Sequence, residues 1–173
     1  MKENRKKVVR NAGPLVRGRI PEFRRVLVST DLSELSNNAI VYAYSIVRSG
    51  GKVRIVHVEK PFEFANLIHA PHPAAMQRLQ EERTLQLDAC RARLRSLVPP
   101  EAGATGILTE VDVLHEDKPA LAICHAAKVF GADVICIASH GRSGLAKTLL
   151  GSVAEAVVKS SSVPVLLVRP CKV

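Results

Sequence analysis

The sequence predicts an α/β protein in which helices cover both faces of a parallel sheet. Strand-like and helix-like segments alternate from residue 25 to residue 168, which is typical of such sheets. Strand-like segments such as Val134–Ile137 are unbroken apolar runs, as expected for parallel strands that are buried on both faces. At 173 residues, the chain is long enough for one domain with a sizeable core.

The first half of the chain begins with an expected strand at Arg25–Thr30. An amphipathic helix is expected at Ser33–Val47, with Ser33 as its N-cap, because a serine hydroxyl can accept from the first free amides. Ser49-Gly50-Gly51 is expected to end this helix. Val53–Val58 is the second expected strand.

The second half continues the alternation. A connection containing Pro and His at Lys60–Pro73 leads to a long helix at Ala74–Val98, which Pro99-Pro100 ends. The remaining expected elements are a strand at Ile107–Leu114, a helix at Pro119–Phe130 with proline in its first turn, a strand at Val134–Ile137, a helix at Ser152–Lys159 and a strand at Val163–Val168.

Composition limits the class of protein. No apolar run approaches the roughly 18 residues of a membrane span. The N-terminus is basic and polar, without the apolar segment of a secretory signal, and we therefore expect a cytoplasmic protein. The four cysteines are scattered, without a Cys-x-x-Cys pair, and are expected to be reduced thiols.

Charge is concentrated at the N-terminus. Residues 1–25 contain nine Lys and Arg against two Glu, so they carry +7 of the net charge of +9. Residues 1–23 are interpreted as a basic extension. Such an arm can bind nucleic acid or an anionic surface through residues 1–25, or it can be a solvated or partly ordered extension. With Phe23 as its one aromatic residue, the arm favours the second interpretation.

The segment between the fourth strand and the next helix has the composition of an anion-binding loop. It contains Gly141, Gly144 and Gly151, and Ser152 is a candidate cap of the following helix. Glycine lets the backbone approach a phosphate closely and permits positive φ, and the amides at a helix N-terminus face negative charge. The alternative is a structural glycine-rich turn that binds no ligand.

This segment resembles the nucleotide loop of the universal stress protein family, Gly-2x-Gly-9x-Gly-(Ser/Thr). Gly141, nine residues and then Gly151-Ser152 match its second half, while Ala138 stands at the position of its first glycine. Val26–Asp31, Val56–Val58 and Val163–Val168 resemble the family's first, second and last strands. The resemblance identifies residues 24–170 as a universal stress protein domain.

The resemblance implies a single-domain, three-layer sandwich whose five-stranded parallel sheet has the order 3-2-1-4-5. This fold is Rossmann-like, of the adenine nucleotide alpha hydrolase-like kind. In that order, the first and fourth strands are neighbours. Asp31 follows the first strand, and Ala138–Gly141 follows the fourth. The two segments are then expected to meet at the switch point of the sheet, where α/β proteins bind ligands.

The resemblance also implies ATP or another adenine nucleotide as ligand. Asp31 would accept from a ribose hydroxyl or hold Mg²⁺ near the phosphates, or it is simply a residue of the helix-entry turn. Val58 would contact the adenine, or it is a plain core valine. The full set of candidate nucleotide-binding residues is Asp31, Val58, Ala138, His140, Gly141, Gly144, Gly151, Ser152 and Val153.

Other sites fit the spacing less well. Gly144 with Lys147-Thr148 lacks the Walker A spacing, and Gly141-Arg142-Ser143-Gly144 lacks that of a hydrolase elbow. The pair His69 and His72 is interrupted by Pro71 and has no third ligand, so a metal there is disfavoured.

Three functions stay open at this point. The first is an ATP-binding sensor or regulator of a stress response, acting on an unknown protein partner. The second is a slow ATPase or phosphotransferase that uses the same site. The third is a homodimeric protein-interaction module without nucleotide, because the methyl group of Ala138, where the motif has glycine, would crowd a phosphate or the ribose. The resemblance implies a homodimer through Val163–Val168, and the alternative is that the basic arm covers this edge strand.

Overall fold

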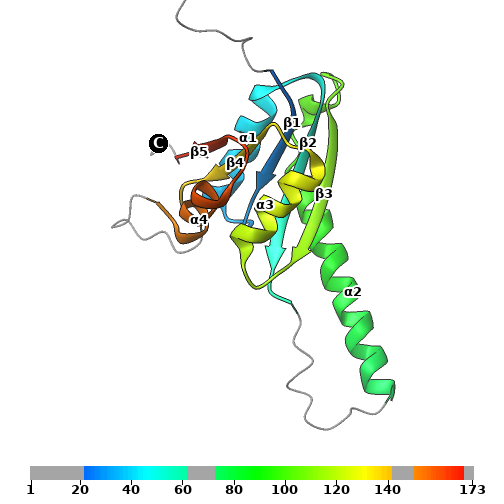
Figure 1. The fold of residues 1–173 in the computed structure, drawn as a ribbon. Coiled ribbons are helices and arrows are strands. Elements are labelled where there is room, and N and C mark those ends of the chain that lie inside the picture. The colour runs from blue at the N-terminus through cyan, green and yellow to red at the C-terminus, as the bar shows by residue number, and fades with distance from the viewer. Residues whose placement is uncertain (1–21, 62–72, 142–149, 170–173) are drawn as a thin grey trace, which may run out of the picture.

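The computed structural model describes residues 22–61, 73–141 and 150–169. Its five parallel strands form one sheet in the order β3-β2-β1-β4-β5, as expected (Figure 1). The elements are β1 (Phe23–Ser29), α1 (Glu34–Ile46), β2 (Val47–Glu59), α2 (Pro73–Ser96), the 3-10 helix η2 (Pro100–Ala102), β3 (Leu108–His115), α3 (Pro119–Phe130), β4 (Val134–Ala138), α4 (Ser152–Ser160) and β5 (Val165–Val168).

Two apolar layers hold the helices to the sheet. On one face, Ile40 of α1 and Leu94 of α2 pack with Val26, Val53 and other buried strand residues. On the opposite face, the buried residues of α3 and α4 pack on the alternate strand positions; these are Ala120, Ile123, Ala126, Ala127, Phe130, Ala154 and Val157. The structure is therefore the three-layer α/β/α sandwich expected from the resemblance, with period-two alternation along the strands.

The boundary between α1 and β2 differs from the expected one. Ser33 caps α1 as expected, since its side chain accepts from the backbone N–H of Ser36, but the helix ends at Ile46. Val47 already pairs with Phe23 of β1, and the next pairing joins Arg25 to Lys52. Residues 48–51 therefore bulge out of the strand, and the two glycines serve this bulge rather than ending the helix.

Gly50 and Gly51 are required in the bulge for different reasons. Gly50 has φ of +72°, which side chains rarely adopt. A Cβ on Gly51 would lie 2.7 Å from the carbonyl oxygen of Arg24, so the two strands approach too closely for a side chain.

The last strand is shorter than expected. It begins at Val165 rather than Val163, because Pro164 precedes it and its carbonyl accepts from Ile135 at 2.9 Å. β5 pairs only with β4, so its other edge is unpaired within the described residues. Pro119 is the first residue of α3, as expected for a proline at a helix start.

The helix α2 differs from the others in its exposure. Its buried residues, Cys90 and Leu94, lie in its C-terminal half, and Figure 1 shows the other half projecting beyond the sheet. None of the helices in the described ranges has the length and apolar character that would let it cross a membrane. Most of the basic extension, residues 1–21, lies outside the described residues, as do His69 and His72.

Candidate functional site

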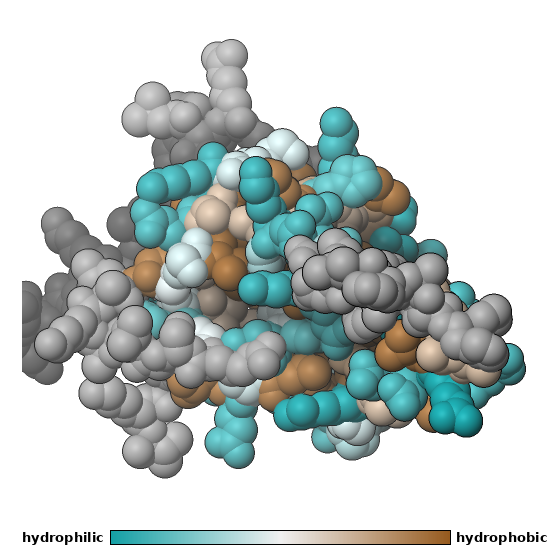
Figure 2. Space-filling view, turned by 90° about the horizontal axis from the view of Figure 1, so that it is seen from below, coloured by the Kyte–Doolittle hydropathy of each residue, from teal (hydrophilic) through white to brown (hydrophobic). Residues whose placement is uncertain are grey.

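A cleft of about 350 Å³ opens at the carboxyl ends of β1, β2 and β4. It lies at the switch point, because α1 and α4 leave β1 and β4 toward opposite faces. Figure 2 views this end of the molecule and shows hydrophilic and hydrophobic residues side by side there. The predicted site residues that line the cleft are Asp31, Val58, Ala138, His140, Gly141, Gly151, Ser152 and Val153. Gly144 lies outside the described residues.

The turn from β1 into α1 fixes the carboxylate of Asp31. The backbone N–H and the hydroxyl of Ser33 both donate to its Oδ1, at 3.0 and 2.6 Å. Its own backbone N–H donates to the Ser36 hydroxyl at 3.2 Å. The cap of the helix therefore also orients the carboxylate toward the cleft.

Leu32, directly after Asp31, has a strained backbone. Its φ is +65°, and a side chain in this region costs roughly 1–2 kcal/mol. Two contacts hold this conformation: the Leu32 N–H donates to Thr30 Oγ1 at 2.9 Å, and Arg93 donates to the Leu32 carbonyl at 3.0 Å. Strain that neighbouring groups hold in place is characteristic of functional turns.

Gly141 brings the loop after β4 against this carboxylate. A Cβ at Gly141 would lie closer to Asp31 Oδ2 than nonbonded atoms approach. Any side chain at position 141 would displace the Asp31 carboxylate, so glycine is needed to keep it where it is. The sequence pattern predicted a glycine that cradles phosphate, but it gave no sign of this second requirement.

The start of α4 corrects one prediction. The N-cap is Gly151, with φ of −69°, and Ser152 is the first residue of the helix. The expected Ser152 cap is therefore wrong. Glycine is instead needed for close approach, since its N–H donates to the Ser139 carbonyl at 2.7 Å and a Cβ would lie 3.2 Å from that oxygen.

The first turn of α4 faces the cleft with Ser152, Val153 and Ala154. In the described part of the chain, no side chain caps this helix. The first amides of a helix have no intrahelical acceptor, and they carry the positive end of its dipole. This wall of the cleft can therefore receive an anion.

The opposite wall is apolar. Val58 at the end of β2 lies there with Ile137 of β4 and with Pro119 and Ile123 of α3. The two α3 residues were not predicted from the sequence. The sequence feature that could have indicated them is the helix start at Pro119, because a helix that follows a parallel strand begins at the carboxyl edge of the sheet.

Ala138 and His140 border the cleft without filling it. Ala138 is 6% exposed and packs in the core layer with Val28 and Ala39, beneath α1. His140 is half-buried, and its Nδ1 lies 3.1 Å from the Ser139 hydroxyl. The methyl group that replaces the first motif glycine is thus largely covered by the core.

His57 is a cleft residue that the sequence analysis assigned no role. It is 5% exposed, and its Nδ1 lies 2.8 Å from the Thr30 carbonyl oxygen. Because a carbonyl only accepts, Nδ1 is the donor in this hydrogen bond. Cys90 of α2 packs against the same face of the sheet. Burial raises the pKa of its thiol, and so does the Glu59 carboxylate, to which the thiol donates a hydrogen bond.

Comparison with known proteins identifies the family. Residues 22–169 match the model of the universal stress protein family. The chain belongs to this family. Universal stress protein MJ0531 of Methanocaldococcus jannaschii is 27% identical to it over 87% of the chain and 84% of that protein. Universal stress protein YxiE of Bacillus subtilis is 26% identical over 85% of the chain and 99% of that protein.

Solved structures of the family share the fold. Hypothetical protein MJ0577 superimposes with a TM-score of 0.70 at 23% identity, covering 88% of this chain and 100% of that one. A universal stress protein in complex with cAMP gives a TM-score of 0.53 at 24% identity, covering 87% and 100%. The Archaeoglobus fulgidus universal stress protein in complex with dAMP gives 0.50 at 18%, covering 85% and 98%.

Proposed function

We propose that this universal stress protein binds an adenine nucleotide, ATP above all, in the cleft at the carboxyl end of its sheet, and that it acts as a nucleotide-dependent regulator. The observation that carries the proposal is the meeting of Asp31, Gly141 and Gly151 around one cleft. Asp31 precedes both glycines by more than 100 positions in the chain.

The two walls of the cleft match the two ends of a nucleotide. An adenine ring suits the apolar wall of Val58, Ile123 and Ile137, because flat apolar surfaces exclude water from its faces. Phosphates suit the uncapped first turn of α4 and the hydroxyl of Ser152. A volume of about 350 Å³ lies within the range of small-molecule sites.

The solved family members support the same class of ligand. Two of their structures are complexes with adenine nucleotides, cAMP and dAMP. Neither complex decides which nucleotide this chain prefers. ATP is proposed because the amides of α4 and the nearby carboxylate of Asp31 fit a phosphate chain that carries a divalent cation.

Asp31 takes one of two alternative roles in this proposal. Its Oδ1 is occupied by Ser33, and its Oδ2 faces the loop of Gly141. The carboxylate would accept from a ribose hydroxyl, or hold Mg²⁺ that neutralises the phosphates. None of the described residues that line the cleft is Lys or Arg, so backbone amides and the cation would supply the positive charge.

Binding is proposed ahead of catalysis for the same reason. Phosphoryl transfer needs an in-line nucleophile and positive charge on the transferring group. Among the described lining residues, His140 and His57 are the basic side chains, and the Nδ1 of His57 is occupied by Thr30. We expect slow ADP release at most, and a phosphate-release assay measures it.

Calorimetry with the full chain tests the proposal. Titration with ATP and Mg²⁺ is expected to give one site per chain, and Asp31→Asn is expected to weaken binding at least about tenfold, because a neutral amide neither holds the cation nor accepts as strongly. Asp88→Asn is the matched control, since Asp88 is exposed on α2 and pairs with Arg91 at 3.4 Å. Absence of heat and of any melting-temperature shift at millimolar ATP would contradict the proposal.

We also propose that two copies pair through the open edge of β5. The strand is apolar, and Leu167 on it is 38% exposed. Unpaired edge strands of this kind tend to pair with another chain. The carbonyls of Pro164 and Val168 accept from amides of β4 and of the residue after it, so the backbone N–H of Leu167, at an alternate position, faces the open edge. Sedimentation velocity is expected to show a dimer that dissociates when Leu167→Pro removes this outward-facing donor, and a monomeric wild-type chain would contradict the proposal.

A further inference from the structure

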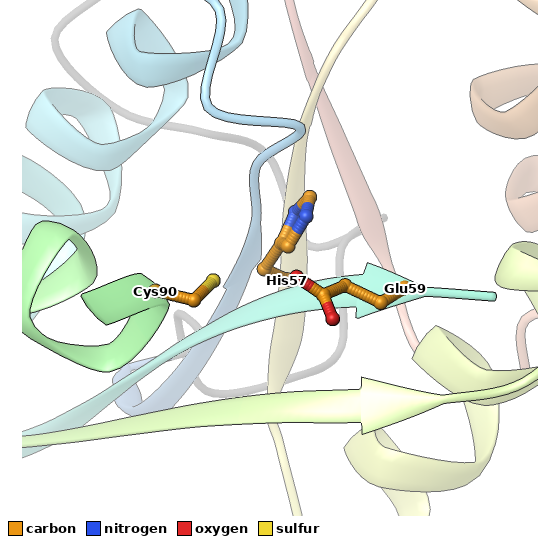
Figure 3. A group of neighbouring side chains, drawn as sticks. All are labelled: His57, Glu59 and Cys90. Carbon is orange, nitrogen blue, oxygen red and sulfur yellow. The ribbon is translucent and has the colours of Figure 1, made fainter. Parts of the chain in front are cut away.

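We propose that His57, Glu59 and Cys90 form a binding site for a borderline-soft divalent metal ion such as Zn²⁺, beside the nucleotide cleft. The three residues are called the His57–Glu59–Cys90 cluster below. A ring nitrogen of His57, a carboxylate oxygen of Glu59 and the Sγ of Cys90 all lie within 4.8 Å of one another. Figure 3 shows the Cys90 side chain pointing from α2 toward the two residues of β2.

The topology explains why the cluster forms. His57 and Glu59 are two positions apart on β2, so their side chains leave the same face of the sheet. Cys90 lies on α2, which covers that face. In a tetrahedral zinc site, ligand atoms lie about 3.3–3.8 Å apart, given zinc–ligand bonds of about 2.0–2.3 Å. Side-chain movements of about 1 Å therefore suffice to close the cluster around the ion.

The ligand types select the metal. Thiolate, imidazole and carboxylate together are ligands of zinc and similar ions, whereas Mg²⁺ prefers oxygen ligands alone. This site is therefore chemically distinct from the Mg²⁺ proposed at Asp31. Three protein ligands leave a fourth coordination position for water or for another molecule.

His57 already has the support that a ligating histidine requires. Its Nδ1–H donates to the Thr30 carbonyl at 2.8 Å, and the ring is 5% exposed. In metal-binding histidines, the N–H of the second ring nitrogen commonly donates to a carbonyl in this way, which fixes the tautomer and the ring orientation. With Nδ1 donating to this carbonyl, Nε2 would be the nitrogen that holds the ion.

Charge balance favours a divalent ion at this depth. Cys90 is 8% exposed, and its S–H donates a hydrogen bond to the Glu59 carboxylate. A divalent ion would replace the thiol proton. The thiolate and the carboxylate together would then neutralise the charge of the ion, which lowers the cost of burying it. The net effect of the protein is to raise the pKa of this thiol, through burial first and Glu59 second, so the proton leaves in exchange for the ion.

Cobalt titration of the reduced, metal-stripped full chain tests the site. Co²⁺ is expected to bind one per chain with a thiolate-to-cobalt charge-transfer band, and Zn²⁺ is expected to displace it. Cys90→Ser is expected to abolish the band, and Glu59→Gln to weaken Zn²⁺ binding at least about tenfold. Cys124→Ser is the control, because Cys124 lies on α3 in the opposite layer.

The readouts separate this site from others in the same chain. Absence of the band in the wild-type chain, or a band that persists in Cys90→Ser, would overturn the proposal, since the metal would then be absent or bound elsewhere. Melting curves of each variant by circular dichroism confirm that it is folded. The site does not depend on nucleotide binding, because Cys90 and Glu59 do not line the cleft, and ATP titration of Cys90→Ser is expected to match that of the wild type.

Discussion

Gly151→Val is expected to weaken ATP binding at least about 100-fold, equivalent to about 2.7 kcal/mol. A Cβ at this position would lie 3.2 Å from the Ser139 carbonyl oxygen, and the two Cγ atoms of valine would extend further around the start of α4. Phosphates are proposed to approach the backbone at that point. The substitution therefore blocks the anion-binding wall of the cleft.

The backbone conformation of Gly151 does not itself require glycine, and a melting curve by circular dichroism shows whether the variant is folded before its binding is measured. Gly151 has φ of −69° and ψ of 150°, a conformation that valine adopts without strain. Calorimetry measures the loss, with Gly103→Val as the control, because a Cβ at Gly103 has no atom within 4 Å. An unchanged dissociation constant for Gly151→Val would remove α4 from the proposed site.

Phe130→Ala is expected to lower the free energy of unfolding by about 3–5 kcal/mol. Phe130 is 1% exposed and closes the layer between α3 and the sheet. The guanidinium groups of Arg25 and Arg54 lie 4.8 and 4.4 Å from its ring centroid. Removal of the ring leaves a cavity and takes away the surface on which both cations rest.

Urea unfolding followed by circular dichroism measures this change. Val129→Ala is the matched control on the same helix, because Val129 is 69% exposed and its substitution should stay within about 0.5 kcal/mol. A loss below about 1 kcal/mol for Phe130→Ala would mean that the α3 layer contributes less to stability than its burial indicates.

Much of the fold could be predicted from the sequence because each signal was local. Apolar runs such as Val134–Ile137 indicated buried parallel strands, and Ser33 and Pro119 indicated helix starts. The strand order came from the family resemblance, since hydrophobic periodicity does not determine which strands are neighbours. The glycines at 50 and 51 were misread because a bulge and a helix end call for the same residue type.

The site was predicted less completely because its contacts are nonlocal. Asp31 and the glycine motif were found by resemblance, but the contact between Asp31 Oδ2 and Gly141 depends on the packing of β1 against β4. Serine is common at helix caps, so the sequence predicts Ser152 there, but the cap is Gly151, whose amide donates to the Ser139 carbonyl. The His57–Glu59–Cys90 cluster was not predicted, because Cys90 is 31 positions from Glu59 and no short motif joins them.

A crystal structure of the full chain grown with ATP and Mg²⁺ tests the central claim most directly. The adenine ring is expected against Val58 and Ile123, with the phosphates at the first amides of α4 and the cation beside Asp31. Nucleotide density elsewhere on the molecule, with this cleft unoccupied, would contradict the account.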